Sequence, residues 1–462
     1  ALPRRVASPD CRSFEPPLGT RAVPGNRRAL AGPRWFSPHT GGYCPANTQG
    51  MTVVLWKAGE WAVTQTAPRA STPRVTITVK RLFGRESADY VVMVSMVFFL
   101  VIFGLVMVLS SSFVGSALGN DGNFFATFFR QAVWVLLGIP MMLVVSRFPA
   151  RSLKKIAPTI FLVALLLQGL VFTPLGFSSG GNTNWVNIAG LTGQPSEILK
   201  IAMIIWMAAI LADRIDDVED YRTLLRPLGL GVLIAWTLVM IGQDLGTTGV
   251  MVVIAVGIVF LAGAGLSHLL TVVALIGTGV GMFALLSPSR VNRIMTWFSG
   301  CTEEDYLGSC WQIVHSTYAL GSGGIFGVGL GNSRAKWSWL PAAETDFIFA
   351  IVGEELGLIG TSMVILSFVV LAVAMARLVR AQPDPFARLV TGGVMVWLIG
   401  QALINIAVVL EVLPVLGVPL PFMSVGGSAL MSSLIGIAVV MALNRHDAIS
   451  VAAGRSRRGS SR

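Results

Sequence analysis

Long apolar stretches, separated by polar connections, recur along the chain from about residue 90 to residue 445. A stretch of about 17–25 apolar residues is long enough to cross the hydrocarbon core of a membrane as a helix. Gly and Pro interrupt several stretches, which packed membrane helices tolerate. The pattern predicts an all-α integral membrane protein with about ten transmembrane helices, over 91–112, 125–146, 156–174, 196–212, 227–242, 247–263, 268–286, 346–376, 390–410 and 425–444.

Lysine and arginine gather in alternate connections between these stretches, at 147–155, 214–226 and 377–388. Because cytoplasmic loops carry an excess of these residues, we expect both termini to be cytoplasmic, which agrees with an even number of crossings. The exception is the charged connection at 287–345, before the eighth helix. Long outer loops can carry charge without reversing the topology, so we expect an extracytoplasmic loop there.

Composition divides the chain into three regions. Residues 1–85 are basic and rich in Pro, Arg, Gly and Ser without a sustained apolar period, and we expect a disordered cytoplasmic region. Residues 86–445 form the polytopic membrane domain. Residues 446–462 form a basic cytoplasmic tail, whose cations suit anionic lipid headgroups.

Overall composition excludes several classes of protein. The 462 residues are 54% hydrophobic and 12% charged, whereas about 25% of residues are charged in soluble domains. An ordinary soluble enzyme and a disordered chain are therefore excluded. The net charge of +11 does not indicate nucleic-acid binding, because the cations flank apolar runs or lie near the N-terminus and do not form a basic stripe.

Four cysteines are too few for a disulfide scaffold in so long a chain. Cys301 and Cys310 both lie in the predicted outer loop, where an oxidising exterior permits a disulfide. We expect these two to pair; the alternative is two free thiols.

Charged residues at the predicted helix ends need partners or a wet cavity, because a charge inside a membrane segment costs roughly 2.5–3.5 kcal/mol on insertion scales. Glu197 and Lys200 follow Gln194 and Ser196 and share a helix face, since they are three residues apart. They form either a structural ion pair or the wall of an outward cavity. Asp244 either caps the next helix or points into the same cavity.

A glycine-rich stretch at 319–337 precedes the eighth helix and contains Arg334 and Lys336. Glycines allow tight bends and close approach to a ligand, and the two cations could hold a diphosphate. Asp346 then opens the helix, at the boundary of water and membrane. Its alternative role is a helix cap.

A Pro- and Gly-rich turn at 417–428 has a re-entrant pattern, which is tolerated at membrane depth only where it is buried in protein or lines a cavity. Deeper in the eighth helix, Glu354 and Glu355 point in different directions, and we expect at least one to have a buried partner. Apart from these two glutamates, all the polar motifs fall on the predicted outer side. This clustering predicts a single extracytoplasmic site.

From about residue 90 to residue 445 the chain resembles the SEDS family (shape, elongation, division and sporulation), the membrane glycosyltransferases of bacterial cell-wall synthesis. The stretch from Asn332 to Trp337 is more similar to the division branch, the FtsW proteins, than to the elongation branch. The chain departs from the family pattern at Asn184, Gln243, His315 and Val425. The resemblance rests on Gln194-Pro195-Ser196-Glu197 with Lys200, Asp244-Leu245-Gly246-Thr247, Ala319-Leu320-Gly321-Ser322-Gly323-Gly324, Thr345-Asp346-Phe347-Ile348-Phe349 with Glu354-Glu355, and Pro419-Leu420-Pro421-Phe422 with Gly426-Gly427-Ser428.

The resemblance implies a peptidoglycan glycosyltransferase of the plasma membrane that polymerises lipid II at the outer face during septal cell-wall synthesis. Asp346 matches the family's catalytic carboxylate, and Glu197, Lys200 and Asp244 match its cavity residues. The implied partners are a class B penicillin-binding protein, which is a transpeptidase, and other divisome proteins. No cofactor is certain; a divalent cation, Mg²⁺ or Mn²⁺, could assist, although the sequence shows no dedicated metal-ligand cluster.

The mechanism that fits needs one general base. Lipid II carries its sugar on a diphosphate, which is a good leaving group, so the paired carboxylates of glycoside hydrolases are not required. Asp346 would deprotonate the attacking 4-hydroxyl, while Arg334, Lys336 and Lys200 stabilise the diphosphate.

Two other functions compete with the polymerase. The first is a flippase for the lipid-linked precursor, but transporters often place charged sites at the midplane between internal repeats, and no repeat is visible here. The second is a scaffold without chemistry, which would not explain why Asp346, Arg334 and Lys336 occur in one glycine-rich stretch.

Overall fold

The computed structural model describes residues 87–459, apart from 120–121, 180–181, 189–190, 216–220, 301–307, 309, 338 and several positions between 266 and 287. These residues belong to one compact unit, Ile77–Arg462. The N-terminal region at 1–85, which the sequence predicts to be disordered, lies outside the described residues.

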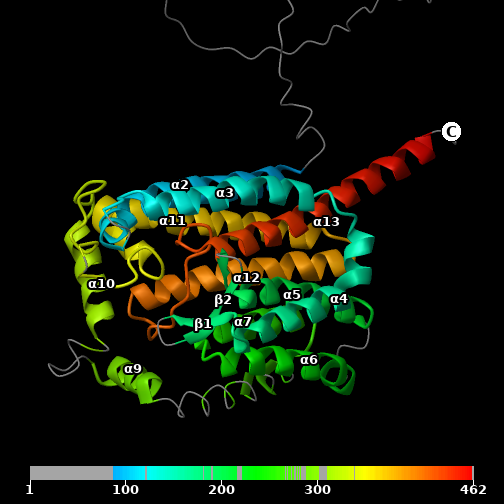
Figure 1. The fold of residues 1–462 in the computed structure, drawn as a ribbon. Helices are drawn as coiled ribbons and strands as arrows, with labels where there is room; N and C mark the ends of the chain where they lie inside the picture. Colours follow the sequence, from blue (N-terminus) through cyan, green and yellow to red (C-terminus); the bar gives the residue numbers. More distant parts are fainter. Residues whose placement is uncertain are drawn as a thin grey trace, which may run out of the picture. The chain divides into compact units, whose positions relative to one another are not determined.

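The described part of the chain is mostly helical, as its apolar runs predict. Its longest helices run alongside one another, and α10 lies across one end of them (Figure 1). The helices are α2 (Ala88–Gly119), α3 (Ala126–Val145), α4 (Ala150–Gly169) with the short η1 (Leu170–Phe172), α5 (Pro195–Ala212), α6 (Tyr221–Ile241), α7 (Leu245–Leu261), α9 (Pro288–Ser299), α10 (Trp311–Gly323), α11 (Ile348–Ala381), α12 (Pro385–Val409) and α13 (Gly427–Gly459).

Seven helices in the described part are long and apolar enough to cross a bilayer: α2, α3, α4 with η1, α5, α11, α12 and the first part of α13. Two shorter apolar helices, Leu228–Ile241 and Leu245–Leu261, coincide with two further predicted spans. The run at 268–286 lies partly outside the described residues. A multi-pass helical membrane protein is therefore confirmed, whereas the number ten and the side of each terminus stay predictions.

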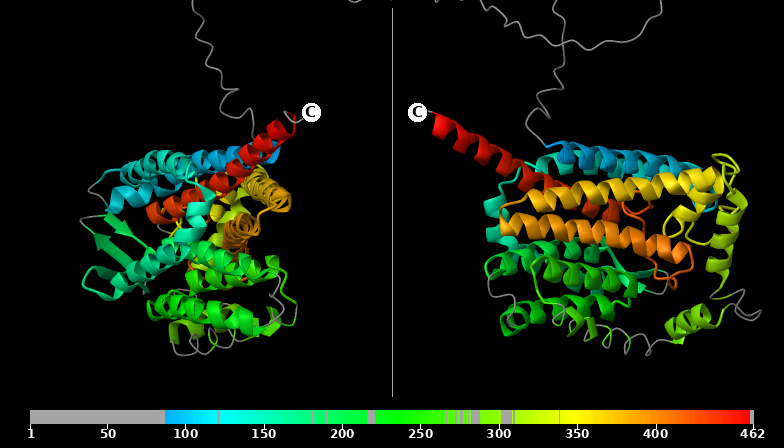
Figure 2. Two further views of the ribbon diagram at one scale, coloured as in Figure 1. Left: turned by 90° about the vertical axis from the view of Figure 1, so that its right-hand side faces the viewer. Right: turned by 180° about the vertical axis from the view of Figure 1, so that it is seen from behind.

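Helices α5 and α12 form the centre of the bundle. Helix α12 packs against α5, α7, α11 and α13, while α2 packs against α3 and α11 (Figures 1 and 2). Helix α5 is apolar on all sides, which is typical of a helix surrounded by others. Trp397 of α12 and Leu199 of α5 are fully buried. The few polar residues on these two helices are consequently forced to find partners inside the protein.

A small antiparallel sheet precedes α5 and corrects the all-α prediction. It consists of β1 (Gly176–Ser179), β2 (Asn182–Ile188) and β3 (Leu191–Gly193) in that order. This polar connection has no helical period, so its backbone groups are paired between short strands instead. Strand β3 leads directly to Gln194 and so fixes where α5 begins.

Two predicted non-membrane regions contain helices. The connection at 287–345 is not only a loop, because it contains α9 and α10. Helix α13 continues to Gly459, so most of the predicted tail at 446–462 extends the last helix and does not begin a separate segment.

Helix α11 is broken at Gly357, whose φ of 65° lies in the left-handed region that favours glycine. The glycine-rich loop fills the break: the N–H groups of residues 328–329 donate to the carbonyls of 354–355 over 2.9 and 3.1 Å. In return, the N–H groups of 358–359 donate to the carbonyls of 324–325 over 2.9 and 3.3 Å. The loop between α10 and α11 is thereby tied to the membrane helix.

Candidate active site

Asp346 lies in a turn just before α11 and is half-buried. Its backbone is held from outside its own helix, because its carbonyl accepts a 2.7 Å hydrogen bond from the side-chain amide of Asn405. The two preceding carbonyls, of residues 344–345, accept from the backbone N–H of Val425 at 2.9 Å and from the Ser424 hydroxyl at 2.5 Å. Three successive carbonyls are therefore fixed by α12 and by the turn before α13.

Helix α12 holds that turn in the same way. Asn405 also donates to the carbonyl of Val418 at 2.7 Å, and Gln401, one helical turn away, donates to the carbonyl of Pro419 at 2.9 Å. The turn is buried in protein, which is one of the two surroundings in which a Pro- and Gly-rich segment is tolerated at membrane depth. Asn405 therefore supports the backbone of both Asp346 and the turn, while Gln401 supports the turn.

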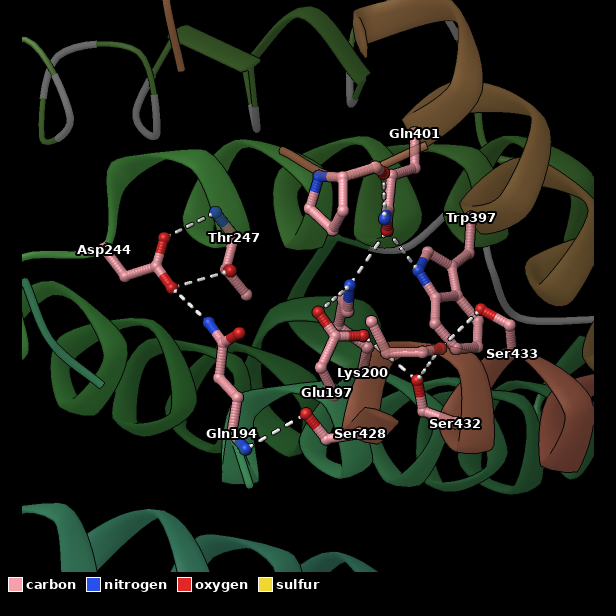
Figure 3. A network of polar contacts seen from close by, with 12 residues as sticks. Gln194, Glu197, Lys200, Asp244, Thr247, Trp397, Gln401, Ser428, Ser432 and Ser433 are labelled. Atoms are coloured by element: carbon pink, nitrogen blue, oxygen red, sulfur yellow. Dashed lines mark hydrogen bonds and ion pairs between the residues drawn. The ribbon is translucent and has the colours of Figure 1, made fainter. Parts of the chain in front are cut away.

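Gln401 extends this support to the ion pair on α5. Its side-chain oxygen accepts from Lys200 Nζ at 2.9 Å and from Trp397 Nε1 at 2.8 Å (Figure 3). Lys200 pairs with Glu197 at 3.0 Å and lies 5.0 Å from the centre of the Trp397 ring. Glu197 accepts a further hydrogen bond, of 3.0 Å, from Ser432.

Glu197 and Lys200 form a buried ion pair, which is the structural alternative that the sequence left open. Each residue is only 1% exposed, so neither lines an open cavity, and the expectation of a wall position is not met. Two opposite charges that are out of water stabilise each other and need each other.

Of the two roles that the sequence left open for Asp244, the structure shows the helix cap. Asp244 caps α7, since Oδ1 accepts from the N–H of Thr247 at 2.9 Å, while Oδ2 accepts from the Thr247 hydroxyl at 2.7 Å. Oδ2 also accepts a 2.8 Å hydrogen bond from Asn184 of β2. It accepts another, also of 2.8 Å, from Gln194 (Figure 3). Four donors without charge therefore tie the sheet and the start of α5 to α7.

Charged residues from distant parts of the sequence, Asp244 and Arg293, act on the carboxyl group of Asp346. The pKa of this carboxyl is raised to about 6: burial raises it most, the negative charge of Asp244 also raises it, and the positive charge of Arg293 on α9 lowers it. Within the described residues the Asp346 carboxylate forms no hydrogen bond or ion pair. It is thus a carboxylate available to take a proton near neutral pH.

Lys336 does not serve as a free cation near Asp346, which corrects one prediction. Its ammonium group donates to the carbonyl of Gly331 at 2.5 Å and pairs with Glu355 at 3.4 Å. Glu355 also accepts from the hydroxyl of Ser110 at 2.6 Å. Glu355 thus has the buried partner that the sequence predicted for at least one of the two glutamates. Arg334 is exposed and lines a different hollow, beside α10.

Gln194 and Ser196 lie near a largely apolar hollow of about 440 Å³, which Gln194 lines together with residues of α3, α4, α5 and α13. Thr192, Ser428 and Ser432 are the other polar residues of its lining. The Ser196 hydroxyl is fully buried and has no hydrogen-bond partner among the described residues. Gln194 therefore lines this hollow and Ser196 does not, and their predicted role in binding substrate stays a prediction.

Cys310 is buried and disulfide-bonded. Its expected partner, Cys301, lies outside the described residues, so the pairing stays a prediction.

No three His, Cys, Asp or Glu side chains among the described residues come together as a metal-ligand set. Mg²⁺ is commonly held by one or two carboxylates together with substrate phosphates. Asp346 and, less readily, the already engaged Asp244 are the residues that could hold such an ion here.

The supporting residues on α12 were missed by sequence reasoning. Gln401 and Asn405 are amides four residues apart in an otherwise apolar span, and both are at most 2% exposed. Polar groups inside membrane helices indicate function or a specific partner, so this spacing was a usable signal.

Known proteins match the part of the chain that contains these site residues. A family model for FtsW, RodA and SpoVE, described as "Cell cycle protein", matches residues 90–449. The chain is 36% identical over 376 residues to a probable peptidoglycan glycosyltransferase FtsW of Mycobacterium tuberculosis, covering 81% of this chain and 71% of that protein. It is 34% identical over 365 residues to stage V sporulation protein E of Bacillus subtilis, covering 78% and 98%.

Solved structures show the same fold. A chain in "Structural coordination of polymerization and crosslinking by a peptidoglycan synthase complex" is 25% identical with a TM-score of 0.63, covering 77% of this chain and 97% of that one. The rod shape determining protein RodA of Thermus thermophilus is 25% identical with a TM-score of 0.56, covering 76% and 95%.

Proposed function

The chain belongs to the FtsW, RodA and SpoVE family of cell cycle proteins, and we infer from this that it is a peptidoglycan glycosyltransferase. Several curated relatives carry that activity in their names. The reaction joins lipid II units into glycan strands at the outer face of the membrane, during septal wall synthesis. The FtsW names among the relatives support the septal role.

The observation that carries the chemistry is Asp346: a half-buried carboxylate on a fixed backbone, with its pKa raised to about 6. A base with a pKa just below the working pH is largely deprotonated and still basic enough to accept a proton. Asp346 takes the proton of the acceptor's 4-hydroxyl as that oxygen bonds to the anomeric carbon. The bond from that carbon to the diphosphate breaks, and the lipid diphosphate leaves.

Arg293 is the cation whose charge acts on Asp346, so we assign it to the developing charge of the leaving diphosphate. This replaces Lys200 and Lys336, whose charges are paired inside the protein. A bound divalent cation would supply further neutralisation of the phosphates.

The partner is a crosslinking enzyme of the class B penicillin-binding type. A similar chain has been solved in a peptidoglycan synthase complex that coordinates polymerization and crosslinking, which supports this assignment. Other divisome proteins would assemble with the pair at the septum.

The test uses the purified full chain in detergent with lipid II, with and without the transpeptidase. The wild type is expected to form glycan strands, and Asp346→Asn to remain folded and form none. Strands made at the wild-type rate by Asp346→Asn would refute the assignment of the base. Transbilayer movement of lipid II in vesicles, with no strands in detergent, would favour the flippase instead.

A further inference from the structure

A second hollow lies beside α10, separate from the Asp346 site. It has a volume of about 320 Å³, and its lining includes His315, Tyr318, Ser322, Arg334, Trp339 and Glu354. This volume falls within the range of about 300–1,000 Å³ that is usual for ligand pockets. We call this hollow the α10 pocket.

One wall of the α10 pocket is a platform of stacked rings. Trp311 and His315, one helical turn apart on α10, have ring centres 4.0 Å apart. Trp339 stacks on both, with ring centres at 6.2 and 5.7 Å and planes within 12° and 23°. Trp339 remains 55% exposed, so a large part of an aromatic surface faces outward on a supported side chain.

Glu354 fixes another part of the pocket lining, the backbone at Arg334 and Ala335. Its carboxylate accepts from the hydroxyl of Ser333 at 2.5 Å and from the backbone N–H groups of Arg334 at 2.7 Å and Ala335 at 3.3 Å. A carboxylate inside a membrane helix is costly, and here it is used to hold the backbone of an exposed segment. Arg334 therefore projects its exposed guanidinium from a fixed backbone, beside the ring platform.

The charges around the pocket argue against an anionic ligand. Arg334 and Lys336 are balanced by Glu354 and Glu355, so the cluster has no net charge to offer a diphosphate. The lining instead combines an aromatic face with hydrogen-bonding groups on Arg334, Tyr318 and Ser322. Sugar rings present the matching chemistry, because their C–H faces stack on aromatic rings and their hydroxyl and acetamido groups form hydrogen bonds.

We propose that the α10 pocket is a saccharide subsite, which holds a neutral N-acetylated sugar ring of the glycan strand while Asp346 acts on another unit. That the pocket binds a sugar is inferred from its lining residues. That this sugar belongs to the glycan strand rests on the proposed function. Both α10 and the start of α11 lie at the same end of the bundle, which a single extended strand could span (Figures 1 and 2).

The first experiment measures binding without catalysis. The full chain in detergent is titrated with a tetramer of N-acetylglucosamine, and binding is followed by saturation-transfer NMR. Trp339→Ala is expected to weaken binding about tenfold, and Trp339→Phe to retain most of it. The matched control is Trp337→Ala, because Trp337 is 64% exposed and does not line the pocket. Equal binding by wild type and Trp339→Ala, or equal loss in both alanine variants, would overturn the proposal.

The second experiment measures strand length from lipid II. Trp339→Ala is expected to give shorter strands than the wild type, and Trp337→Ala, outside the pocket, to match the wild type in both strand length and initial rate. If the wild type makes no strands, the proposed function fails, while the titration still decides the subsite. If Trp339→Ala loses only the stimulation by a transpeptidase and keeps saccharide affinity and strand length, the pocket is a protein-binding surface and the proposal is wrong.

Discussion

Asn405 donates a 2.7 Å hydrogen bond from its side chain to the backbone carbonyl of Asp346, and so joins α12 to the residue that precedes α11. The same amide nitrogen donates to the carbonyl of Val418. A side chain only 1% exposed thus sets the position of the proposed base without touching its carboxylate. Asn405 is a positioning residue in this arrangement.

Asn405→Ala should lower the rate of strand formation at least about tenfold, because a small displacement of a catalytic group is costly. The half-buried carbonyl of Asp346 and the buried carbonyl of Val418 lose their donor, which should also lower the free energy of unfolding by about 1–3 kcal/mol. Asn444→Ala is the control: Asn444 also forms two side-chain hydrogen bonds, but with Val440 and with Gln382 at the other end of α11. Asn405 positions Asp346 if Asn444→Ala is destabilised about as much as Asn405→Ala but keeps full activity. In that case only Asn405→Ala should also change the dependence of the rate on pH. An equal loss of activity in both would point to general destabilisation.

The rate of polymerisation should rise with pH through about 6, because Asp346 accepts a proton only when it is ionised. Initial rates between pH 5 and 8 test this. Removing the positive charge in Arg293→Ala should move the acidic limb to higher pH, and Asp244→Asn should move it lower, since the repelling charge is lost. Shifts in the same direction would contradict the electrostatic account.

Asp346→Asn should be more stable than the wild type at pH 7.5. A pKa raised from 3.8 to about 6 means that the folded state binds more protons than the unfolded chain between these values, so stability falls as pH rises through this window. The penalty for the ionised carboxylate reaches at most about 3 kcal/mol above pH 6. Unfolding of both proteins, measured from pH 4 to 8, should show a difference that disappears near pH 4. A constant difference across this range would exclude titration of Asp346 as its cause.

Lys200→Met should destabilise the protein by about 3–5 kcal/mol, because Glu197 is left as a buried charge with only a hydroxyl partner. Adding Glu197→Gln should recover part of the loss, since the uncompensated charge disappears. Thermal unfolding in detergent measures both. A double variant that recovers stability and polymerises lipid II would make the pair purely structural, whereas one that is stable and inactive would give it a role in the reaction.

Gly357→Ala should weaken the junction between α10 and α11. Its φ is 65°, and an added Cβ would lie 2.5 Å from the backbone nitrogen of Gly327. Gly249→Ala in α7 is the control, because its φ is not positive and nothing lies within 4 Å of its added Cβ. The control should be neutral or more stable by about 0.5–1 kcal/mol. Proteolysis of the α10–α11 loop would report the difference, and equal resistance of the two variants would argue against a strained junction.

Much of the fold follows from local properties of the sequence. A helix long and apolar enough to cross a membrane needs only its own composition, so the seven spans found among the described residues lie close to their predicted positions. The sheet before α5 was missed because its strands are short and polar and are stabilised only by each other. Helices α9 and α10 were missed because they lie in a connection of mixed polarity. Each is also too short to cross the membrane, so neither produces the long apolar run that marks a span.

The sequence by itself determined the class of protein, its membrane segments and the set of acidic and basic residues that need partners, because burial in lipid penalises an unpaired charge whatever the fold. Only the tertiary structure decided the pairings. It joined Lys336 to Glu355, Asp244 to Asn184 and Gln194, and Asn405 to the backbone of Asp346. Hydrogen bonds and ion pairs depend on distances of a few ångströms between residues that are tens to hundreds of positions apart, and those distances arise only when the helices pack together.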